Sequence, residues 1–408
     1  MKCRHCGSPV TLPFIDLGTA PPSNAYLDAH ALDSPETWYP LRVLVCERCW
    51  LVQTQDYAHA SELFSAEYAY FSSFSSSWLA HARDYTERMC ARFSLNAGSR
   101  VVEVAANDGY LLQYFQERGI PNFGIEPTAA TARAARERGI DVVEDFFGAR
   151  LAETLRREGK TADLMIANNV LAHVPDINDF VRGFAILLQP QGVATFEFPH
   201  LLNLVRENQF DTIYHEHFSY LSLTAVMRIF AANGLAVFDV EELTTHGGSL
   251  RVYAQRAADG VRPVEAGVRA VLAFEEAAGV RTGAFYAGFQ ARADKVKNDL
   301  LAFLIDAKRR GRTVVAYGAA AKGNTLLNYA GVRPDLIAFV VDRNPAKQGK
   351  YMPGSRIPIV GEGEIPRIRP DYLIVLPWNL KAEIAAQLEY AREWGAAFVT
   401  AVPSLHVQ

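Results

Sequence analysis

Short apolar segments alternate with helix-like segments through the middle of the chain. Four mainly apolar runs predict buried strands at residues 101–104, 122–125, 162–167 and 192–196. Between them, apolar residues at helical spacing predict helices at 111–118, 129–139, 152–158 and 177–188, with a further short strand at 142–143. This alternation is typical of a doubly wound α/β sheet, in which ligands bind at the C-terminal ends of the strands.

The same pattern divides the rest of the chain. A helix at 79–93 precedes the sheet, and a helix at 224–233 and a hairpin of 236–243 and 250–255 follow it. A second α/β pattern begins at 313, with strands at 337–341, 372–375 and 398–399 and helices from about Thr325 and Lys381. A chain of 408 residues is expected to form two or three domains. We assign an N-terminal module to 1–60, a central domain to 61–263, a helical connection to 264–310 and a C-terminal domain to 311–408.

The first strand of the central domain ends in a turn that holds a single glycine, Gly109. A dinucleotide-binding turn carries three glycines, so this turn is poorly suited to a pyrophosphate. Glu103 and Asp108 add negative charge, and Glu126 follows the second strand, where an acid commonly binds a ribose. These features favour S-adenosylmethionine (SAM), a cationic nucleoside without phosphate; an ordinary α/β turn with a chance acid is the alternative. The candidate cofactor-binding residues are Glu103, Ala105, Asn107, Asp108, Gly109, Glu126, Pro127, Asp145, Phe146, Asn168 and Asn169.

Four of the five cysteines form two C-x-x-C pairs, Cys3 with Cys6 and Cys46 with Cys49. Two such knuckles in one small module are typical of a tetrahedral zinc site that is structural, because four thiolates complete the coordination sphere. The spacing of about forty residues between the pairs is long, but an inserted loop is tolerated. The alternatives are a pair of disulfides, or His5 as one of the ligands.

A loop after the fifth strand carries histidines, a glutamate and tyrosines. Tyr214 precedes His215, Glu216 and His217, and on a strand the two histidines would share one face. A general-base histidine held by the neighbouring acid is the favoured interpretation, because histidine titrates near neutral pH. A metal site and a surface loop are the alternatives. His173 follows another strand end and either faces a substrate or is a satisfied loop histidine.

Two further stretches are candidate substrate sites. Tyr68 and Tyr70 precede the helix at 79–93, where they either line a pocket or pack against the helix start. After the strand that begins at 313, a small-residue turn with Lys322 favours an anion, because backbone amides at a helix start bind anions. A lobe without a ligand is the alternative here. The candidate substrate-binding residues are Tyr70, His246, Tyr317, Lys322, Asn324 and Arg343.

Charge and hydropathy exclude several classes of protein. The net charge is −4 and no tail is basic, so neither a nucleic acid nor an anionic membrane is expected as a partner. No run approaches the ~18 apolar residues of a spanning helix, and the N-terminus lacks the apolar core of a secretory signal. We therefore expect a cytoplasmic protein.

Four motifs occur in order along the chain: the paired C-x-x-C, E-V-A-A-N-D-G at 103–109, Y-H-E-H-F-S-Y-L at 214–221, and Y-G-A-A-A-K-G-N at 317–324 with V-D-R-N-P-A-K-Q-G-K-Y-M-P-G at 341–354. Over nearly its full length the chain resembles bacterial sugar C-methyltransferases that act on nucleotide-linked 4-keto deoxyhexoses. The resemblance implies an α/β protein with a zinc-binding N-terminal module, a central class I SAM methyltransferase domain and a C-terminal Rossmann-like domain. It also implies a monomer and a dTDP-linked sugar, with the nucleotide diphosphate held by the C-terminal lobe.

The resemblance further implies a reaction. A ketone at C-4 acidifies the proton at C-3, a base makes an enolate, and the enolate attacks the methyl group of SAM. His217 matches the family's base, Tyr214 and Glu216 line the sugar pocket, and Tyr68 and His173 match substrate-pocket positions. We expect the tyrosines and His173 to donate hydrogen bonds to the enolate oxygen.

Four other functions compete with this one. Methylation at C-5 uses the same ketone, and an O- or N-methyltransferase of small metabolites needs no enolate. A nicotinamide dehydrogenase built on the C-terminal turn is disfavoured, because residues 318–323 lack the full glycine set. A zinc-ribbon ligand sensor is the non-enzymatic alternative, and it would have no use for a poised base.

Overall fold

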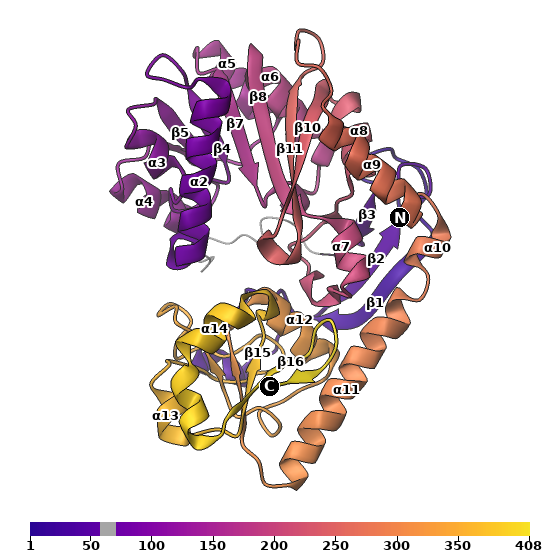
Figure 1. Ribbon diagram of the computed structural model, residues 1–408, viewed down its shortest axis with the longest axis vertical. Coiled ribbons are helices and arrows are strands. Elements are labelled where there is room, and N and C mark those ends of the chain that lie inside the picture. The colour runs from indigo at the N-terminus through magenta and orange to yellow at the C-terminus, as the bar shows by residue number, and fades with distance from the viewer. Residues whose placement is uncertain (58–70) are drawn as a thin grey trace.

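The described chain forms two lobes joined along one side by a long helix (Figure 1). The structure is a computed structural model that describes residues 1–57 and 71–408. The upper lobe in Figure 1 contains a seven-stranded sheet and the lower lobe a six-stranded sheet, and a four-stranded sheet lies beside the junction. Within these residues, no helix combines the length and apolar character needed to cross a bilayer.

The N-terminal sheet is completed by a strand from much later in the chain. Strands β1 (Leu12–Ala20), β2 (Tyr39–Val45) and β3 (Val52–Thr54) form an antiparallel meander. Strand β9 (Ser219–Tyr220) follows the loop of residues 210–218, which carries His215 and His217 and is called the histidine loop below. It pairs with β3 and places Tyr220 opposite Val52. The module expected at 1–60 is therefore built into the central lobe rather than attached to it as a separate unit.

The central sheet has the predicted doubly wound form, with strand order β10-β11-β8-β7-β4-β5-β6. Strands β4 to β8 are parallel, and β11 runs antiparallel between β8 and β10. Side chains of β4 alternate between the two faces: Val102 and Val104 pack in one core cluster and Val101 in another. The strands are β4 (Val101–Val104), β5 (Asn122–Ile125), β6 (Val142–Val143), β7 (Ala162–Asn168), β8 (Leu188–Pro199), β10 (Leu235–Leu243) and β11 (Ser249–Arg256).

Helices cover both faces of this sheet. Ser75 begins the longest of them in the central lobe, because its Oγ accepts a hydrogen bond from the backbone N–H of Trp78 at 3.2 Å. The helices are α2 (Ser76–Phe93), α3 (Leu112–Gln116), α4 (Ala129–Glu137), α5 (Ala149–Arg157), α6 (Ile177–Leu187), α7 (Leu201–Arg206) and α8 (Leu223–Ala232). The predicted connection consists of α9 (Ala266–Ala278), α10 (Gly283–Tyr286) and α11 (Phe289–Arg309).

The C-terminal lobe is a second α/β sheet, parallel except for its last strand, with order β14-β13-β12-β15-β16-β17. Its first helix corrects the sequence analysis: it begins at Ala321, not at Thr325, so Lys322 and Asn324 lie in the helix. No side chain caps this helix, and small residues give little signal of a start. The elements are β12 (Val314–Tyr317), α12 (Ala321–Tyr329), β13 (Val340–Val341), β14 (Ile359–Val360), α13 (Glu364–Ile368), β15 (Tyr372–Val375), α14 (Lys381–Gln387), β16 (Ala397–Thr400) and β17 (His406–Val407).

The long insertion between the cysteine pairs docks on the C-terminal lobe. Leu27 and Tyr351 exchange backbone hydrogen bonds of 3.0 and 2.8 Å, and Glu36 Oε1 accepts from the backbone N–H of Gly354 at 2.7 Å. The sequence analysis treats this stretch as a tolerated loop, whereas the structure gives it a role in joining the lobes.

A buried carboxylate, Glu275 of α9, ties three segments of the central lobe together. It is fully buried and accepts hydrogen bonds from His200 Nε2 at 2.7 Å and from the backbone N–H groups of Leu223 and Thr224 at 2.6 and 2.8 Å. The Thr224 hydroxyl donates a further bond of 2.6 Å. Because the two amides belong to the first turn of α8, Glu275 adds to the cap that Ser222 makes by accepting from the backbone N–H of Ala225.

We predict that Glu275→Ala lowers the free energy of unfolding of this lobe by about 3 kcal/mol, because it leaves several buried donors unpaired. The adjacent residue gives a matched control: Glu276 is exposed and paired only with Arg281 at 2.6 Å, so Glu276→Ala should cost less than about 0.5 kcal/mol. Thermal unfolding followed by circular dichroism measures both, and equal midpoints for the two variants would contradict the prediction.

Candidate active site and metal centre

The turn after β4 has an unusual backbone shape. Ala105, Asn107 and Gly109 have positive φ values of 57°, 50° and 76°. Such values are uncommon for residues with side chains and often mark turns whose shape serves a function. Glu126 supports the turn, because its Oε2 accepts from the backbone N–H of Asn107 at 3.0 Å while its Oε1 accepts from that of Thr128 at 3.0 Å. The acid predicted to bind a ribose therefore also holds the turn in place.

Next to this turn lie buried polar atoms without partners. Glu103 and Asp108 are each 1% exposed. Among the described residues, no hydrogen bond of normal geometry reaches either oxygen of Glu103, Oδ1 of Asp108 or the side-chain amide of Asn168. Burial raises the pKa of Glu103 well above its ordinary value; the nearby Tyr110 hydroxyl lowers it, and the carboxylates of Asp108 and Glu126 raise it. Unpaired buried groups are costly, so this acidic pocket fits a polar cation such as SAM.

Other predicted cofactor residues lie at neighbouring strand ends. Asp145 is engaged by its own chain: Oδ2 binds Arg150 at 2.7 Å and Oδ1 accepts from the backbone N–H of Phe146 at 2.8 Å. The Phe146 ring is 50% exposed, and Pro127 is half-buried beside Glu126. The exposed ring is available for stacking on a ligand.

The turn between β10 and β11 contacts Asn169, which follows β7. His246 has a positive φ of 54°, and its Nε2 lies 3.2 Å from Nδ2 of Asn169. The Trp78 ring lies 5.2 Å from His246 and 4.8 Å from His81. Burial lowers the pKa of His246 to about 4, so its imidazole is neutral at pH 7. This places His246, predicted as a substrate residue, against the predicted cofactor residue Asn169.

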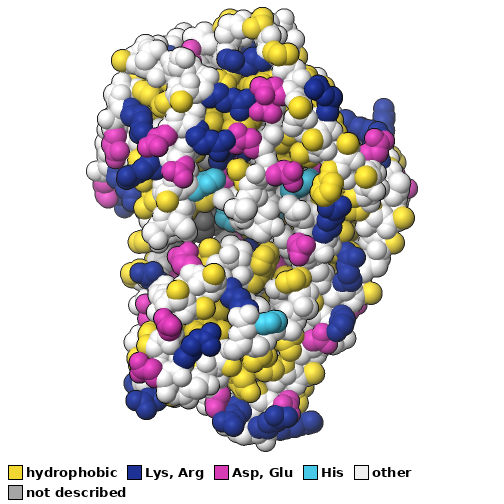
Figure 2. Space-filling view, viewed as in Figure 1, with side chains coloured by type: hydrophobic (Ala, Val, Ile, Leu, Met, Phe, Trp, Pro, Cys, Tyr) yellow, Lys and Arg dark blue, Asp and Glu magenta, His cyan; other side chains and the backbone are white. Residues whose placement is uncertain are grey.

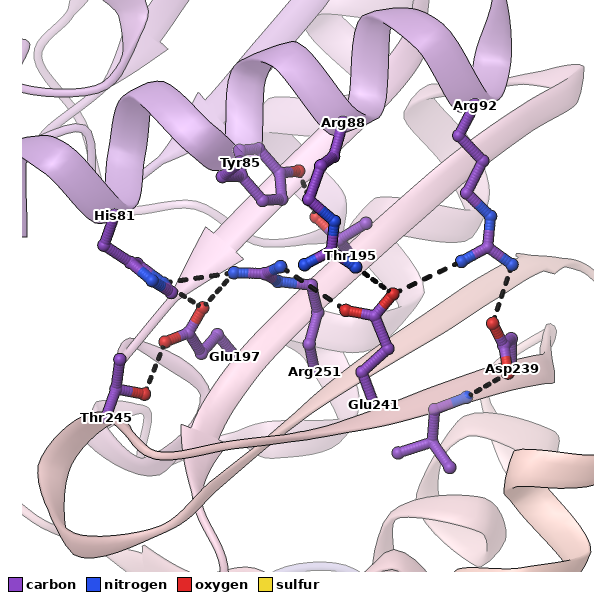
Figure 3. Close-up of polar contacts among 11 residues, drawn as sticks. His81, Tyr85, Arg88, Arg92, Thr195, Glu197, Asp239, Glu241, Thr245 and Arg251 are labelled. Atoms are coloured by element: carbon purple, nitrogen blue, oxygen red, sulfur yellow. Dashed lines mark hydrogen bonds and ion pairs between the residues drawn. The ribbon is translucent and has the colours of Figure 1, made fainter.

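His81 belongs to a buried ionic network that the sequence analysis did not identify (Figure 3). Glu197 accepts from Nε2 of His81 at 2.9 Å, from the guanidinium of Arg251 at 2.8 Å and from the hydroxyl of Thr245 at 2.9 Å. Burial raises the pKa of Glu197, but the His81 hydrogen bond and the Arg251 charge outweigh it and bring the pKa to about 2. Glu197 directly follows the predicted strand at 192–196, which is the one sequence signal that marked it.

Two histidines face each other at the centre of the site. The rings of His173 and His217 lie 4.6 Å apart, and Tyr214 lies 3.9 Å from His217. Nδ1 of His217 lies 2.8 Å from the carbonyl oxygen of Thr212, and Nδ1 of His173 lies 2.8 Å from that of Glu216. A carbonyl can only accept, so each Nδ1 carries the proton and each Nε2 carries a lone pair.

Both histidines are neutral at pH 7. Burial lowers the pKa of His173 to about 4. Burial also lowers the pKa of His217 well below its ordinary value, and the nearby His173 and Lys322 lower it further. Figure 2 shows histidine side chains in the indentation between the two lobes. A buried neutral imidazole can serve as a base.

The histidine loop departs from two expectations. His215 and Glu216 lie in a turn, and Nε2 of His215 points to the carbonyl of Pro40 at 3.3 Å, away from the His173–His217 pair. The expectation that the neighbouring acid holds the base is also wrong, because a backbone carbonyl orients His217. Oε1 of Glu216 instead accepts from the backbone and side-chain N–H groups of Asn24 at 3.2 and 3.1 Å, and its buried Oε2 has no hydrogen-bond partner among the described residues.

The C-terminal residues predicted to bind substrate do not form one group. Lys322 points to the junction of the lobes, where its Nζ donates to Oδ1 of Asn379 at 2.8 Å. Tyr317 and Arg343 instead meet at Glu362, which accepts from the Tyr317 hydroxyl and lies 3.9 Å from Arg343. Burial lowers the pKa of Lys322.

Asn324 and Asp342 complete this lobe. The amide of Asn324 is fully buried and has no hydrogen-bond partner among the described residues. Asp342, which follows the second strand of the lobe, accepts from the backbone N–H groups of Ala319 and Asn344, each at 2.8 Å. Asp342 therefore holds its own turn in the same way as Glu126 does in the central lobe. The predicted pocket residues Tyr68 and Tyr70 lie outside the described residues.

The four paired cysteines form one compact cluster. All four Sγ atoms lie within 4.8 Å of one another, with Cys3 3.5 Å from Cys49 and Cys6 3.5 Å from Cys46. Each contact joins the two knuckles, and four thiolates on a tetrahedral zinc ion stand about 3.8 Å apart. Nδ1 of His5 lies 2.8 Å from Asn178, and His5 is not part of the cluster. The donor set therefore fits zinc without a histidine ligand.

Profiles of three families match successive parts of the chain. A "Putative zinc binding domain" matches residues 3–64, a "Methyltransferase domain" matches 78–240, and a "C-methyltransferase C-terminal domain" matches 244–403. Together with the strand order of the central sheet, these matches define a class I SAM-dependent methyltransferase with an N-terminal cysteine cluster.

The C-methyltransferase NovU of Streptomyces niveus is 34% identical over 408 residues, which are 100% of this chain and 96% of that protein. The chain therefore belongs to the C-methyltransferase family, and it is a SAM-dependent enzyme. A ubiquinone biosynthesis O-methyltransferase of Rhodopseudomonas palustris (strain TIE-1) is 27% identical over 161 residues, 33% of this chain and 61% of that protein. The magnesium protoporphyrin IX methyltransferase of Synechocystis, solved with SAM, is 15% identical over 44% of this chain and 79% of that chain, with a TM-score of 0.34, too low to support any statement on function.

We predict that Cys46→Ser removes bound zinc and lowers the thermal midpoint, because binding of a structural zinc ion contributes to folding. Cys90 lies in α2, outside the cluster, so Cys90→Ser is the matched control and should keep a full zinc content. Metal analysis by mass spectrometry and a thermal melt test both variants. A metal-free wild-type protein of unchanged stability would contradict the zinc site.

Proposed function

We propose that the enzyme transfers the methyl group of SAM to C-3 of a dTDP-linked 4-keto deoxyhexose. The observation that carries this proposal is the tautomer of His217. Its Nδ1 is bound to a carbonyl, so the buried, neutral ring offers Nε2 as a proton acceptor. Carbon methylation needs such a base, because the carbon must lose a proton to become nucleophilic.

The proposed steps balance in atoms and charge. Nε2 of His217 takes the proton from C-3, and the electron pair of that C–H bond moves toward the C-4 carbonyl to form the enolate. The enolate carbon then attacks the methyl group, and the bond from methyl to sulfur breaks to leave S-adenosylhomocysteine. The Tyr214 ring lies tilted against the His217 ring, and its hydroxyl is proposed to donate a hydrogen bond to the enolate oxygen.

The role of His173 must be revised from the sequence analysis. It was expected to donate to the enolate oxygen, but its only ring proton binds the carbonyl of Glu216. With a pKa of about 4, the ring carries no second proton at pH 7. We infer that His173 accepts a hydrogen bond from a sugar hydroxyl and keeps a positive charge away from His217.

The remaining roles follow from position. We propose that Glu103, Asp108 and Asn168 bind the methionine end of SAM, because both oxygens of Glu103, Oδ1 of Asp108 and the side-chain amide of Asn168 are buried and lack a hydrogen bond of normal geometry within the described residues. The C-terminal lobe, through Lys322 and Asn324, is proposed to hold the nucleotide, and the enzyme is proposed to act as a monomer. The zinc ion is structural in this scheme and takes no part in the chemistry.

We predict that His217→Asn abolishes exchange of the C-3 proton in D₂O while SAM binding persists. His215→Gln is the matched control, because His215 contacts the N-terminal module and should leave exchange within about twofold. NMR of a panel of 4-keto sugar nucleotides with S-adenosylhomocysteine bound measures exchange without methyl transfer. Unchanged exchange in His217→Asn would remove this residue from the base role, and exchange or methylation at C-5 would correct the regiochemistry. Methylation at oxygen would instead support an O-methyltransferase, and binding without any turnover would support a sensor.

We further predict that Glu103→Gln weakens SAM and S-adenosylhomocysteine alike, by about tenfold or more, because both carry the same ammonium group. Glu117→Gln, an exposed change in the same lobe, is the control. The free pocket raises the pKa of Glu103, whereas a bound cation favours the ionised form, so binding releases a proton. Calorimetry should therefore show SAM affinity rising with pH in the wild type and staying flat in Glu103→Gln. A loss confined to SAM would place Glu103 at the sulfonium instead.

A further inference from the structure

One side chain of the C-terminal lobe reaches the loop that orients the base. The indole Nε1 of Trp378 donates to Oδ2 of Asp211 at 2.7 Å. Asp211 lies in the short helix η4 (Phe210–Thr212), and the carbonyl that binds Nδ1 of His217 belongs to the next residue, Thr212. Only one peptide unit therefore separates the contact with the C-terminal lobe from the contact with the base.

The same indole also packs against the turn Thr245–Gly247, which joins β10 to β11. A Cβ atom at Gly247 would lie 2.5 Å from Cη2 of Trp378, so the ring and the turn backbone touch with no room to spare. The turn carries Thr245, which bonds to Glu197, and His246, which contacts Asn169. Trp378 thus contacts both the segment that orients His217 and the turn that carries His246.

Other contacts fix the ring itself. Nζ of Lys322 lies 4.7 Å from the ring centroid and donates to Asn379, the residue next to Trp378. Asp211 is 1% exposed, and its Oδ1 has no hydrogen-bond partner among the described residues. The indole N–H is accordingly the one side-chain donor that the described chain offers to this carboxylate at hydrogen-bond distance.

We propose that Trp378 is a positioning residue that fixes His217 relative to the turn Thr245–Gly247, so that the C-terminal lobe helps to set the geometry of proton abstraction. This inference rests on the proposed function, in which His217 removes the C-3 proton. Its physical basis is the sensitivity of such steps to position: a displacement of about 1 Å caused by a distant change can cost a factor on the order of 100 in rate.

The test compares substitutions that keep or remove single contacts. Trp378→Phe keeps an aromatic ring at this position but deletes both the N–H and the Cη2 atom that contacts Gly247, so exchange of the C-3 proton at saturating substrate should fall about 10- to 100-fold while KM and SAM affinity stay within about twofold. Trp394 gives the matched control, because its Nε1 donates to the carbonyl of Pro370 within the C-terminal lobe at 3.1 Å. Trp394→Phe should leave exchange unchanged.

Asp211 supplies the other half of the test. Asp211→Asn keeps an oxygen that accepts from the indole and should retain most of the exchange rate, whereas Asp211→Ala should match Trp378→Phe. If both act through one hydrogen bond, the double variant Trp378→Phe/Asp211→Ala should be no slower than the slower single variant. Zinc content and thermal midpoint confirm that each variant is folded.

The outcomes separate this inference from the proposed function. If the wild type exchanges the C-3 proton but Trp378→Phe does so at the same rate, or if the two single losses multiply in the double variant, the positioning role is overturned. A change in KM with an unchanged rate at saturation would also overturn it, since that result indicates substrate binding alone. If the wild type itself exchanges no proton on any 4-keto sugar nucleotide, the proposed function fails instead.

Discussion

The hydrogen bond between Nδ1 of His217 and the carbonyl of Thr212 is the constraint on which the rest of the site depends. It fixes which ring nitrogen carries the proton, and burial then keeps the other nitrogen unprotonated at neutral pH by lowering the pKa. A backbone acceptor achieves this without placing a negative charge beside the imidazole, which would raise its pKa. The tautomer therefore persists only while the backbone of residues 210–217 keeps its conformation, and the fold has to stabilise that conformation.

In both lobes, a carboxylate stabilises the turn after the first strand by accepting hydrogen bonds from two backbone N–H groups. In the central lobe, Glu126 accepts from the amides of Asn107 and Thr128; in the C-terminal lobe, Asp342 accepts from those of Ala319 and Asn344. The two lobes differ in the side chains that lie near this turn. The central lobe adds the unpaired carboxylate of Glu103, whereas the C-terminal lobe directs Lys322 toward the junction. The same α/β arrangement thus places a buried carboxylate near one turn and a lysine at the junction of the lobes.

The sequence was informative where structure follows from local pattern. The strands at 101–104 and 122–125 have the predicted bounds, and the cysteine spacing anticipated the four-Sγ cluster. It was less informative where the outcome depends on contacts between distant segments. Nothing in the short run at 219–220 reveals that it pairs with β3, and a helix start without a capping side chain hid the position of Lys322. The sequence could not predict which ring nitrogen of His173 carries the proton either, because this depends on which nitrogen reaches the carbonyl oxygen of Glu216.

All three parts of the chain meet on the histidine loop, and this convergence explains the long spacing between the cysteine pairs. Asn24 of the insertion binds the side chain of Glu216, strand β9 continues the N-terminal sheet, and Thr325 of α12 donates to the carbonyl of Ile213 at 2.8 Å. A short zinc knuckle could not reach both the loop and the C-terminal lobe. The insertion adds chain length at modest entropic cost, since loop-closure entropy grows slowly with length, and its backbone pairing with Tyr351 gives it a fixed path. The cysteine cluster therefore stabilises more than its own module, because it anchors one end of the segment that holds the histidine loop against the second lobe.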